Sequence, residues 1–244
     1  MHHLIALFAG CLLHPPADDP CKEARTAQAE FLRSHGAEVT EWNANGTVRT
    51  MKTTGIVLPP RVADLKVDES APAILSAIGP ALLARGTEEL RVRDIFRDEL
   101  GDSIQIKLDQ FIGGHEVLWA KVGIIVNAQS YEITALTATF MPDRGLEHEP
   151  RLSPDEARAK ATPALRQSVR TQPGSADKEV SFSDEPAQLV YEFEELSSQA
   201  ILGGALVWLF SAKGVNKVSV DAATGRIVRI STVFVSWPEL PRRP

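Results

Sequence analysis

The chain has 244 residues and a formal net charge of −6; 43% of its residues are hydrophobic and 24% are charged. This composition excludes an intrinsically disordered chain, and the length is enough for one large domain or two small ones. A nucleic-acid partner is not expected, because phosphate binding needs concentrated positive charge and no Arg/Lys run exceeds Arg242-Arg243.

Residues 1–37 are expected to form a signal-like segment followed by a polar tether. Their apolar run is shorter than the roughly 20 residues of a membrane-spanning helix, and it suits the apolar region of a secretory signal. Residues 7–11, Leu-Phe-Ala-Gly-Cys, resemble a bacterial lipobox, which predicts lipidation of Cys11 and membrane anchoring through that lipid. Without acylation, Cys11 and Cys21 could form a disulfide in an oxidising compartment. We therefore expect an exported protein: a periplasmic or cell-envelope lipoprotein, or a secreted protein.

The first expected elements after the tether are a hairpin and a helix. Two stretches with β-branched residues flank Asn45-Gly46, a dipeptide that supplies the positive φ values of a tight turn. The helix that follows has Ser70 as its expected N-cap and apolar residues at helical spacing. Gly79-Pro80 is expected to kink this helix or divide it into two short ones.

The next segments indicate an antiparallel meander. Residues 89–101 are expected to form a strand and then a short amphipathic helix that ends at Gly101. From residue 103 apolar and polar residues alternate, which places Ile104, Ile106 and Leu108 on one face of a strand. Two further strands follow, with a turn near residues 127–130, so the pattern predicts a sheet with one buried face.

The second half predicts one helix and an antiparallel sheet. Ser153 as N-cap, Pro154 at the first helical position and Glu156 make a capping box, and Pro163 is expected to bend or split the helix. Strands near residues 188–194 and 205–212 precede a hairpin whose turn lies at residues 222–225. The fold class expected from both halves is α+β, with two small domains that each pack a helix on an antiparallel sheet.

His115-Glu116 begins like the zinc-peptidase motif H-E-x-x-H, but Trp119 occupies the position of the second histidine. Gly113-Gly114 and the alternating residues around this stretch predict a turn and a strand, where neighbouring side chains point to opposite faces. We therefore expect no metal site, no catalytic residues and no cofactor. Paired acids such as Glu88-Glu89 are expected on solvated surfaces.

The last hairpin, "VSVDAATGRIVRI" at residues 218–230, resembles the closing strands of a PepSY domain, with Asp-Ala before a Thr-Gly turn. The segment "LSPDEARAKA" resembles the helix of that domain, and "QLVYEFEEL" with "ALVWLFSA" resembles its next strands. This resemblance assigns residues 146–236 to a PepSY-like domain, with 237–244 as a tail.

Residues 38–145 resemble the fungalysin/thermolysin propeptide (FTP) domain, through "WNANGTVRTMKTTGIVLPP" and the meander after residue 103. In thermolysin-family metallopeptidases this tandem is a prosegment that assists folding of the zinc catalytic domain and inhibits it until cleavage. The resemblance implies a non-catalytic, chaperone-like or inhibitory protein that acts in trans on a thermolysin-like metallopeptidase.

The C-terminal tail is the expected contact segment for such a peptidase, because its prolines favour an extended chain that resists cleavage. Trp237, Pro238 and Leu240 are the expected partner-binding residues, with Trp237 as the anchor; a frayed terminus explains the tail equally well. Two other functions remain open. One is a cell-envelope lipoprotein that binds without a peptidase partner, and the other is a truncated peptidase precursor.

Overall fold

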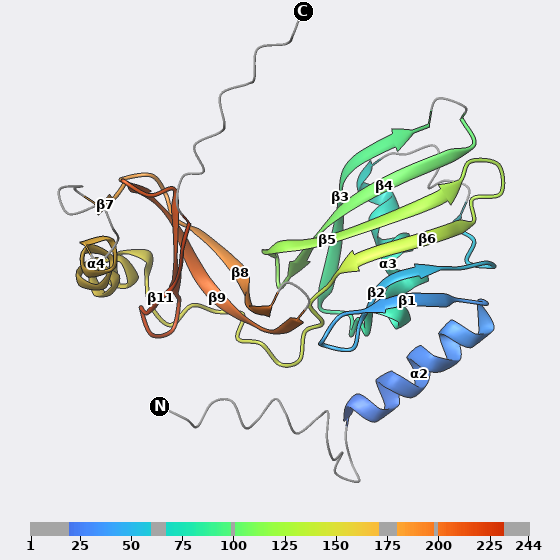
Figure 1. Cartoon of the computed structure of the whole chain (residues 1–244), viewed down its shortest axis with the longest axis horizontal. Helices are drawn as coiled ribbons and strands as arrows, with labels where there is room; N and C mark the ends of the chain where they lie inside the picture. Colours follow the sequence, from blue (N-terminus) through green and yellow to red (C-terminus); the bar gives the residue numbers. More distant parts are fainter. Residues whose placement is uncertain (1–19, 60–66, 99–100, 171–179, 198–199, 232–244) are drawn as a thin grey trace, which may run out of the picture. The chain divides into compact units, whose positions relative to one another are not determined.

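The computed structural model describes residues 20–59, 67–98, 101–170, 180–197 and 200–231 (Figure 1). Within these residues the fold is α+β, which confirms the predicted class. The chain divides into two compact units, which are described separately below. The first runs to Leu146 and includes Tyr191–Gly204, and the second comprises Glu147–Val190 and the chain from Ala205 onward.

The first unit contains an antiparallel sheet. Its strands lie in the spatial order β1 (Glu38–Trp42), β2 (Val48–Lys52), β6 (Ile133–Thr139), β5 (His115–Asn127), β4 (Ser103–Ile112) and β3 (Glu88–Arg97). A single parallel bridge between Val117 and Tyr191 joins β5 to β8 (Gln188–Ser197). The Asn45-Gly46 hairpin is confirmed: Trp42 pairs with Val48, and Gly46 has the positive φ of 84° that the turn requires.

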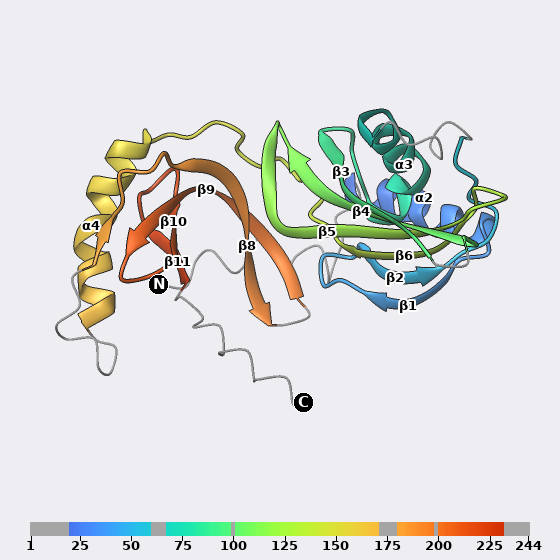
Figure 2. The same ribbon diagram turned by 90° about the horizontal axis from the view of Figure 1, so that it is seen from above.

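One face of this sheet is buried against helix α3 (Val67–Leu82), which Figures 1 and 2 show lying across it. The predicted alternation in β4 is confirmed, since Ile104, Ile106 and Leu108 are at most 2% exposed. Burial of each such side chain contributes about 1.5–3 kcal/mol, so this layer is the main source of stability in the first unit. The opposite face of the sheet carries the polar and charged positions of β4.

Helix α3 corrects one prediction and decides between the alternatives of another. It begins at Val67, so Ser70 lies inside the helix, 2% exposed, and is not the N-cap. The helix also continues through Pro80 to Leu82 as one element, because a proline in the last turn removes only one backbone donor. It then ends abruptly: Leu83 has a φ of 56°, and the amide of Ala84 donates to the carbonyl of Gly79 at 3.0 Å.

The short amphipathic helix expected to end at Gly101 is also wrong, because β3 continues as a strand to Arg97. Ile95 pairs with Ile106 and Phe96 with Gln105, so the backbone finds its partners along β4. Pairing along a strand ten residues long outweighs the local helical pattern of "DIFRDEL". Tertiary context overrides propensity here.

The expected tether contains a helix, α2 (Pro20–Ser34). Its buried Gln28 donates from Nε2 to the carbonyl of Ala81 at 2.8 Å and to that of Gly46 at 3.2 Å. One side chain thus joins α2 to the end of α3 and to the β1–β2 turn. No helix among the described residues is long and apolar enough to cross a bilayer.

The second unit packs helix α4 (Pro154–Arg170) against strands β9 (Ala200–Lys213), β10 (Lys217–Asp221) and β11 (Ile227–Ser231), with the short β7 (Ser181–Phe182) paired to β9. The capping box is confirmed. The Ser153 amide donates to Glu156 Oε2 at 2.8 Å, and the Glu156 amide donates to Ser153 Oγ at 3.3 Å. The bonds from the Ser153 amide and hydroxyl lower the pKa of Glu156. Pro163 does not split α4.

The β10–β11 turn explains why the sequence there reads Asp-Ala-Ala-Thr-Gly. Asp221 Oδ1 accepts the amides of Ala223 and Thr224 and the Thr224 hydroxyl. Gly225 has a φ of 77°, and a Cβ there would lie 2.8 Å from Lys160 Cβ on α4. The turn therefore needs a short acceptor at its start and a residue without a side chain where it meets the helix.

Candidate interaction surface

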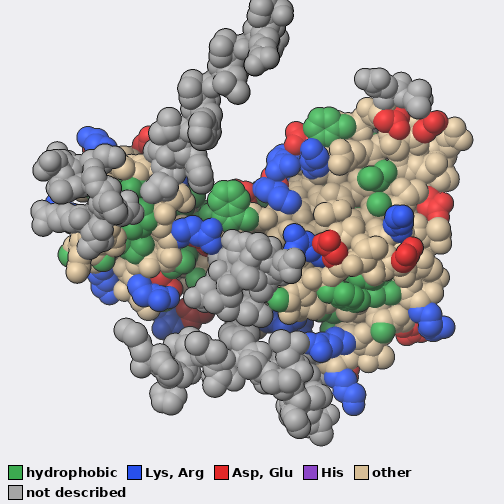
Figure 3. All heavy atoms as spheres, viewed as in Figure 1, with side chains coloured by type: hydrophobic (Ala, Val, Ile, Leu, Met, Phe, Trp, Pro, Cys, Tyr) green, Lys and Arg blue, Asp and Glu red, His purple; other side chains and the backbone are tan. Residues whose placement is uncertain are grey.

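The uncovered face of the first sheet carries large hydrophobic side chains. Phe96 is 48% exposed and Ile125 is 39% exposed, and both are paired to Gln105, so they flank it in one row across β3, β4 and β5. Figure 3 views this face and shows Lys and Arg side chains gathered beside hydrophobic ones over β3 and β4. Exposed hydrophobic side chains with charged neighbours are a common feature of protein–protein contact sites.

Trp119 is 62% exposed and projects from an irregular part of β5. Asp109 pairs with Lys121 and Phe111 pairs with Glu116, so only Gln110 on β4 lies opposite residues 117–120. Within this bulge Trp119 has a φ of 67°, a backbone conformation that costs a bulky residue about 1–3 kcal/mol. Bulges re-aim side chains, so the fold holds a tryptophan in solvent at a conformational cost.

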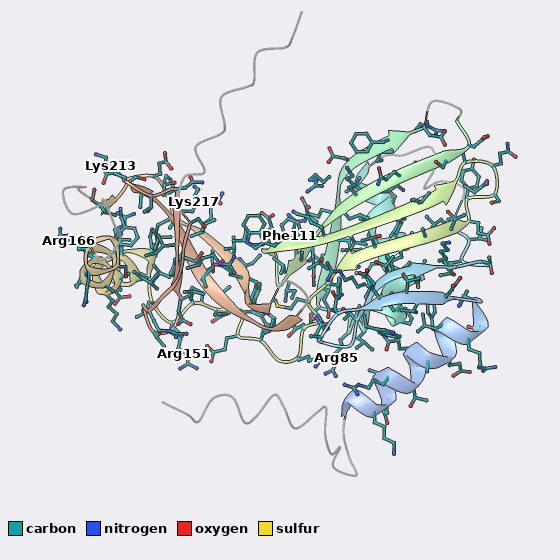
Figure 4. All side chains as sticks on the ribbon, viewed as in Figure 1. Arg85, Phe111, Arg151, Arg166, Lys213 and Lys217 are labelled. Carbon is teal, nitrogen blue, oxygen red and sulfur yellow. The ribbon has the colours of Figure 1, made fainter. Side chains whose placement is uncertain are left out.

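Cations surround the aromatic side chains of this face. Arg91 lies over the ring of Phe111, with Cζ 3.8 Å from the ring centroid, and Lys107 Nζ lies 4.7 Å from that of Phe96. Figure 4 labels Phe111 beside the β4–β5 hairpin. Asp109 on β4 forms ion pairs with both neighbouring strands. Its Oδ1 accepts from Lys121 on β5 at 2.6 Å and from Arg93 on β3 at 3.4 Å. We call Arg91, Phe111, Trp119 and Lys121 the bulge surface.

A buried glutamine lies opposite the bulge. Gln110 is fully buried; its Nε2 donates to the Met141 carbonyl at 2.5 Å, and its Oε1 accepts the Met141 amide at 2.9 Å. The side-chain amide therefore makes the two hydrogen bonds that a neighbouring strand would make. It fixes the chain that leaves β6 and supports the strand on which Phe111 lies.

Glu88 corrects the prediction of a solvated acidic pair. It is 3% exposed, and its carboxylate accepts the amides of Arg85 at 2.8 Å, Gly86 at 3.0 Å and Asp143 at 2.7 Å. Three backbone donors thus satisfy the buried carboxylate. Glu89, its neighbour in sequence, is exposed as expected.

His115 begins β5, where the sequence predicted a turn and then a strand. Its ring packs edge-on against Tyr191, with the centroids 6.4 Å apart. No group of His, Cys, Asp or Glu side chains within the described ranges could hold a metal ion.

Tyr191 gives the first unit a predicted sensitivity to alkaline pH. Burial, and secondarily the charge of Asp143, raise the pKa of Tyr191 from 10.0 to about 12. A raised folded-state pKa means that stability is complete below pH 10 and falls as the pH rises toward 12. We expect tyrosinate absorbance to show this late ionisation together with loss of stability. The Tyr191→Phe variant should lack the late step and Tyr131→Phe should retain it; the reverse assignment would contradict the prediction.

The residues predicted to bind a partner or a lipid, Trp237, Pro238, Leu240 and Cys11, lie outside the described residues. Sequence reasoning missed the bulge surface. One signal was present: the buried positions of β5 are Val117, then Ala120 and Val122, so the period of two breaks at Trp119. A break of phase inside a strand is the signature of a bulge.

Residues 151–230 match the family model described as "Peptidase propeptide and YPEB domain", or PepSY. These limits take in α4 and the strands through β11 up to Ile230. No match to the FTP family accompanies it, so the assignment of residues 38–145 stays a prediction. No curated protein matches the chain. The matched module is of a non-catalytic, propeptide or inhibitor type, and such domains occur in exported proteins. The chain thus carries a PepSY domain at residues 151–230.

Proposed function

We propose that this protein is an exported, non-catalytic, prosegment-like protein that binds a thermolysin-like zinc metallopeptidase in trans, and inhibits it or assists its folding. The observation that carries the proposal is the PepSY match at residues 151–230. The resemblance of the preceding residues to an FTP domain supports the same reading, since the two together make a peptidase prosegment.

The bulge surface supports a protein partner rather than a small ligand. Binding energy at interfaces concentrates in Trp, Tyr and Arg side chains, and here the exposed Trp119 and Arg91 belong to strands β5 and β3 of one sheet. The backbone conformation at Trp119 is unfavourable in the free protein, so its retention calls for a role outside folding.

The C-terminal tail is the second proposed contact. Trp237, Pro238 and Leu240 would enter the peptidase cleft as an extended segment, with proline limiting cleavage. The tail and the bulge surface are separate hypotheses about the same complex, so they need separate variants.

The test is addition of the purified chain to a panel of thermolysin-like zinc peptidases, with peptide hydrolysis measured at increasing protein concentration. We expect saturable inhibition of at least one peptidase, and we expect deletion of residues 235–244 to weaken it about tenfold or more, as for loss of an interface anchor. Refolding yield of the same denatured peptidases, with and without the protein, tests assistance of folding.

The control is a trypsin-like serine peptidase, which should be unaffected. A folded protein that neither binds nor inhibits any zinc peptidase, and does not raise refolding yields, would contradict the proposal. That outcome would favour the envelope binding module without a peptidase partner.

A further inference from the structure

We propose that a basic cluster beside the start of α2 docks the protein onto an anionic phospholipid surface. The cluster is defined by Lys22, Arg25, Arg85 and Arg144. It is separate from the bulge surface and from the tail, and its test does not depend on the peptidase hypothesis.

Two of these cations, Arg25 and Arg144, come from different parts of the chain to the β1–β2 turn. The guanidinium of Arg25, on α2, lies close to this turn. A Cβ placed on Gly46 would lie 4.0 Å from an Arg25 Nη and 3.9 Å from Leu83 Cδ1. Arg144 donates from Nη2 to the carbonyl of Asn45 at 2.6 Å. Arg85 lies two residues after Leu83, and Figure 4 shows it at the end of the first unit where α2 begins.

Of the carboxylates near this cluster in sequence, those of α2 lie on another flank of the helix, and Asp18 and Asp19 lie outside the described residues. Lys22 and Arg25 are three residues apart and share a flank of α2, whereas Glu23 and Glu30 are seven apart and lie on a different flank. Glu88, which is close in sequence to Arg85, is buried and bonded to backbone amides. Among the described residues no ion pair involves any of the four cations.

The carbonyl groups at the C-terminal end of α3 do not neutralise the cations of the cluster. The last carbonyls of α3 attract cations through the helix dipole, but the carbonyl of Ala81 already accepts Gln28. Arg25 and Arg85 are exposed, so their guanidinium donors are free to bind an outside anion. Phosphodiester headgroups match guanidinium groups in charge and hydrogen-bonding geometry.

The position of the cluster in the chain favours a membrane over an acidic protein. Pro20, the first residue of α2, is nine residues after Cys11, so an extended connection spans at most about 30 Å. A lipid on Cys11 would therefore hold the cluster close to a bilayer. One acyl signal anchors weakly, and a basic patch is a common second signal. Because the chain has a net charge of −6, attraction to anionic lipid has to come from a local group of cations such as this one.

The experiment is vesicle flotation of the full chain carrying Cys11→Ser, which removes any lipid. The vesicles are phosphatidylcholine alone, or phosphatidylcholine with about one-third phosphatidylglycerol. We expect binding to the anionic vesicles only, with a steep decrease on addition of salt. The Arg25→Glu/Arg85→Glu variant should bind these vesicles at least about tenfold more weakly than the parent does. The control Lys213→Glu/Arg226→Glu makes the same charge change at exposed positions of the second unit and should bind as the parent does.

Three results would overturn the proposal: no binding to anionic vesicles, equal binding to neutral ones, or an equal loss in both double variants. If the cluster variant binds vesicles normally but loses peptidase inhibition, the cluster belongs to the protein interface and the membrane proposal is wrong. If vesicle binding is lost while inhibition persists, both proposals stand independently.

Discussion

Replacement of Gln110 by alanine is expected to lower the free energy of unfolding by about 3 kcal/mol. The change leaves both the amide and the carbonyl of Met141 without the side chain that bonds them in a buried setting, and each such group costs about 1–3 kcal/mol. It also opens a cavity beneath the bulge, because Gln110 is fully buried. Urea denaturation monitored by tryptophan fluorescence measures the effect.

Gln105→Ala is the matched control, because Gln105 lies on the same strand with its side chain in solvent. It should change the free energy of unfolding by less than about 0.5 kcal/mol. Gln110→Glu retains an acceptor for the Met141 amide but sets a second acceptor, charged at neutral pH, against the Met141 carbonyl, so a loss at least as large as that of Gln110→Ala is expected. Equal stability of the Gln105 and Gln110 variants would show that the Met141 contacts contribute nothing.

Replacement of Trp119 by glycine is expected to separate stability from function. Glycine adopts a φ of 67° without strain, so the free energy of unfolding should stay level or rise by up to about 1 kcal/mol. If the proposed complex uses the bulge surface, the inhibition constant should rise about thirtyfold, as for the loss of a central aromatic worth about 2 kcal/mol. Paired denaturation and inhibition measurements give both quantities.

Two further variants control for this result. Trp119→Ala removes the same ring but keeps a side chain at positive φ, so it should lose inhibition without the gain in stability. Trp42→Ala removes another exposed tryptophan, 49% exposed on β1, and should leave inhibition unchanged. Full inhibition by both Trp119 variants would place the interface elsewhere.

The elements that sequence reasoning recovered have short-range causes. The hairpin at Asn45-Gly46, the capping box at Ser153 and the alternation of β4 are each encoded within about ten residues. The turn that holds Gly225 belongs with them, since its Asp, Thr and Gly act on one another. Local chemistry alone decides these conformations.

The features that it missed depend on residues far apart in the chain. Glu88 is buried because the amide of Asp143, 55 residues away, completes its set of donors. Gln110 is buried because Met141 needs a strand-like partner. The bulge surface combines β3, β4 and β5, whose register no local pattern specifies. In the sequence such positions look like ordinary polar residues, because their hydrogen-bond partners come close only in the folded sheet.

The attachment of α2 bears on how fragments of this protein should be cut. A fragment that begins at Glu38, where the first strand starts, would contain every strand of the antiparallel sheet in the first unit but not Gln28. The carbonyls of Gly46 and Ala81 would lose the donor that they share, and the apolar flank of Phe31 and Leu32 would no longer cover the core. Recombinant versions should therefore begin before Pro20, and a shorter fragment that aggregates would report a missing helix rather than an unstable domain.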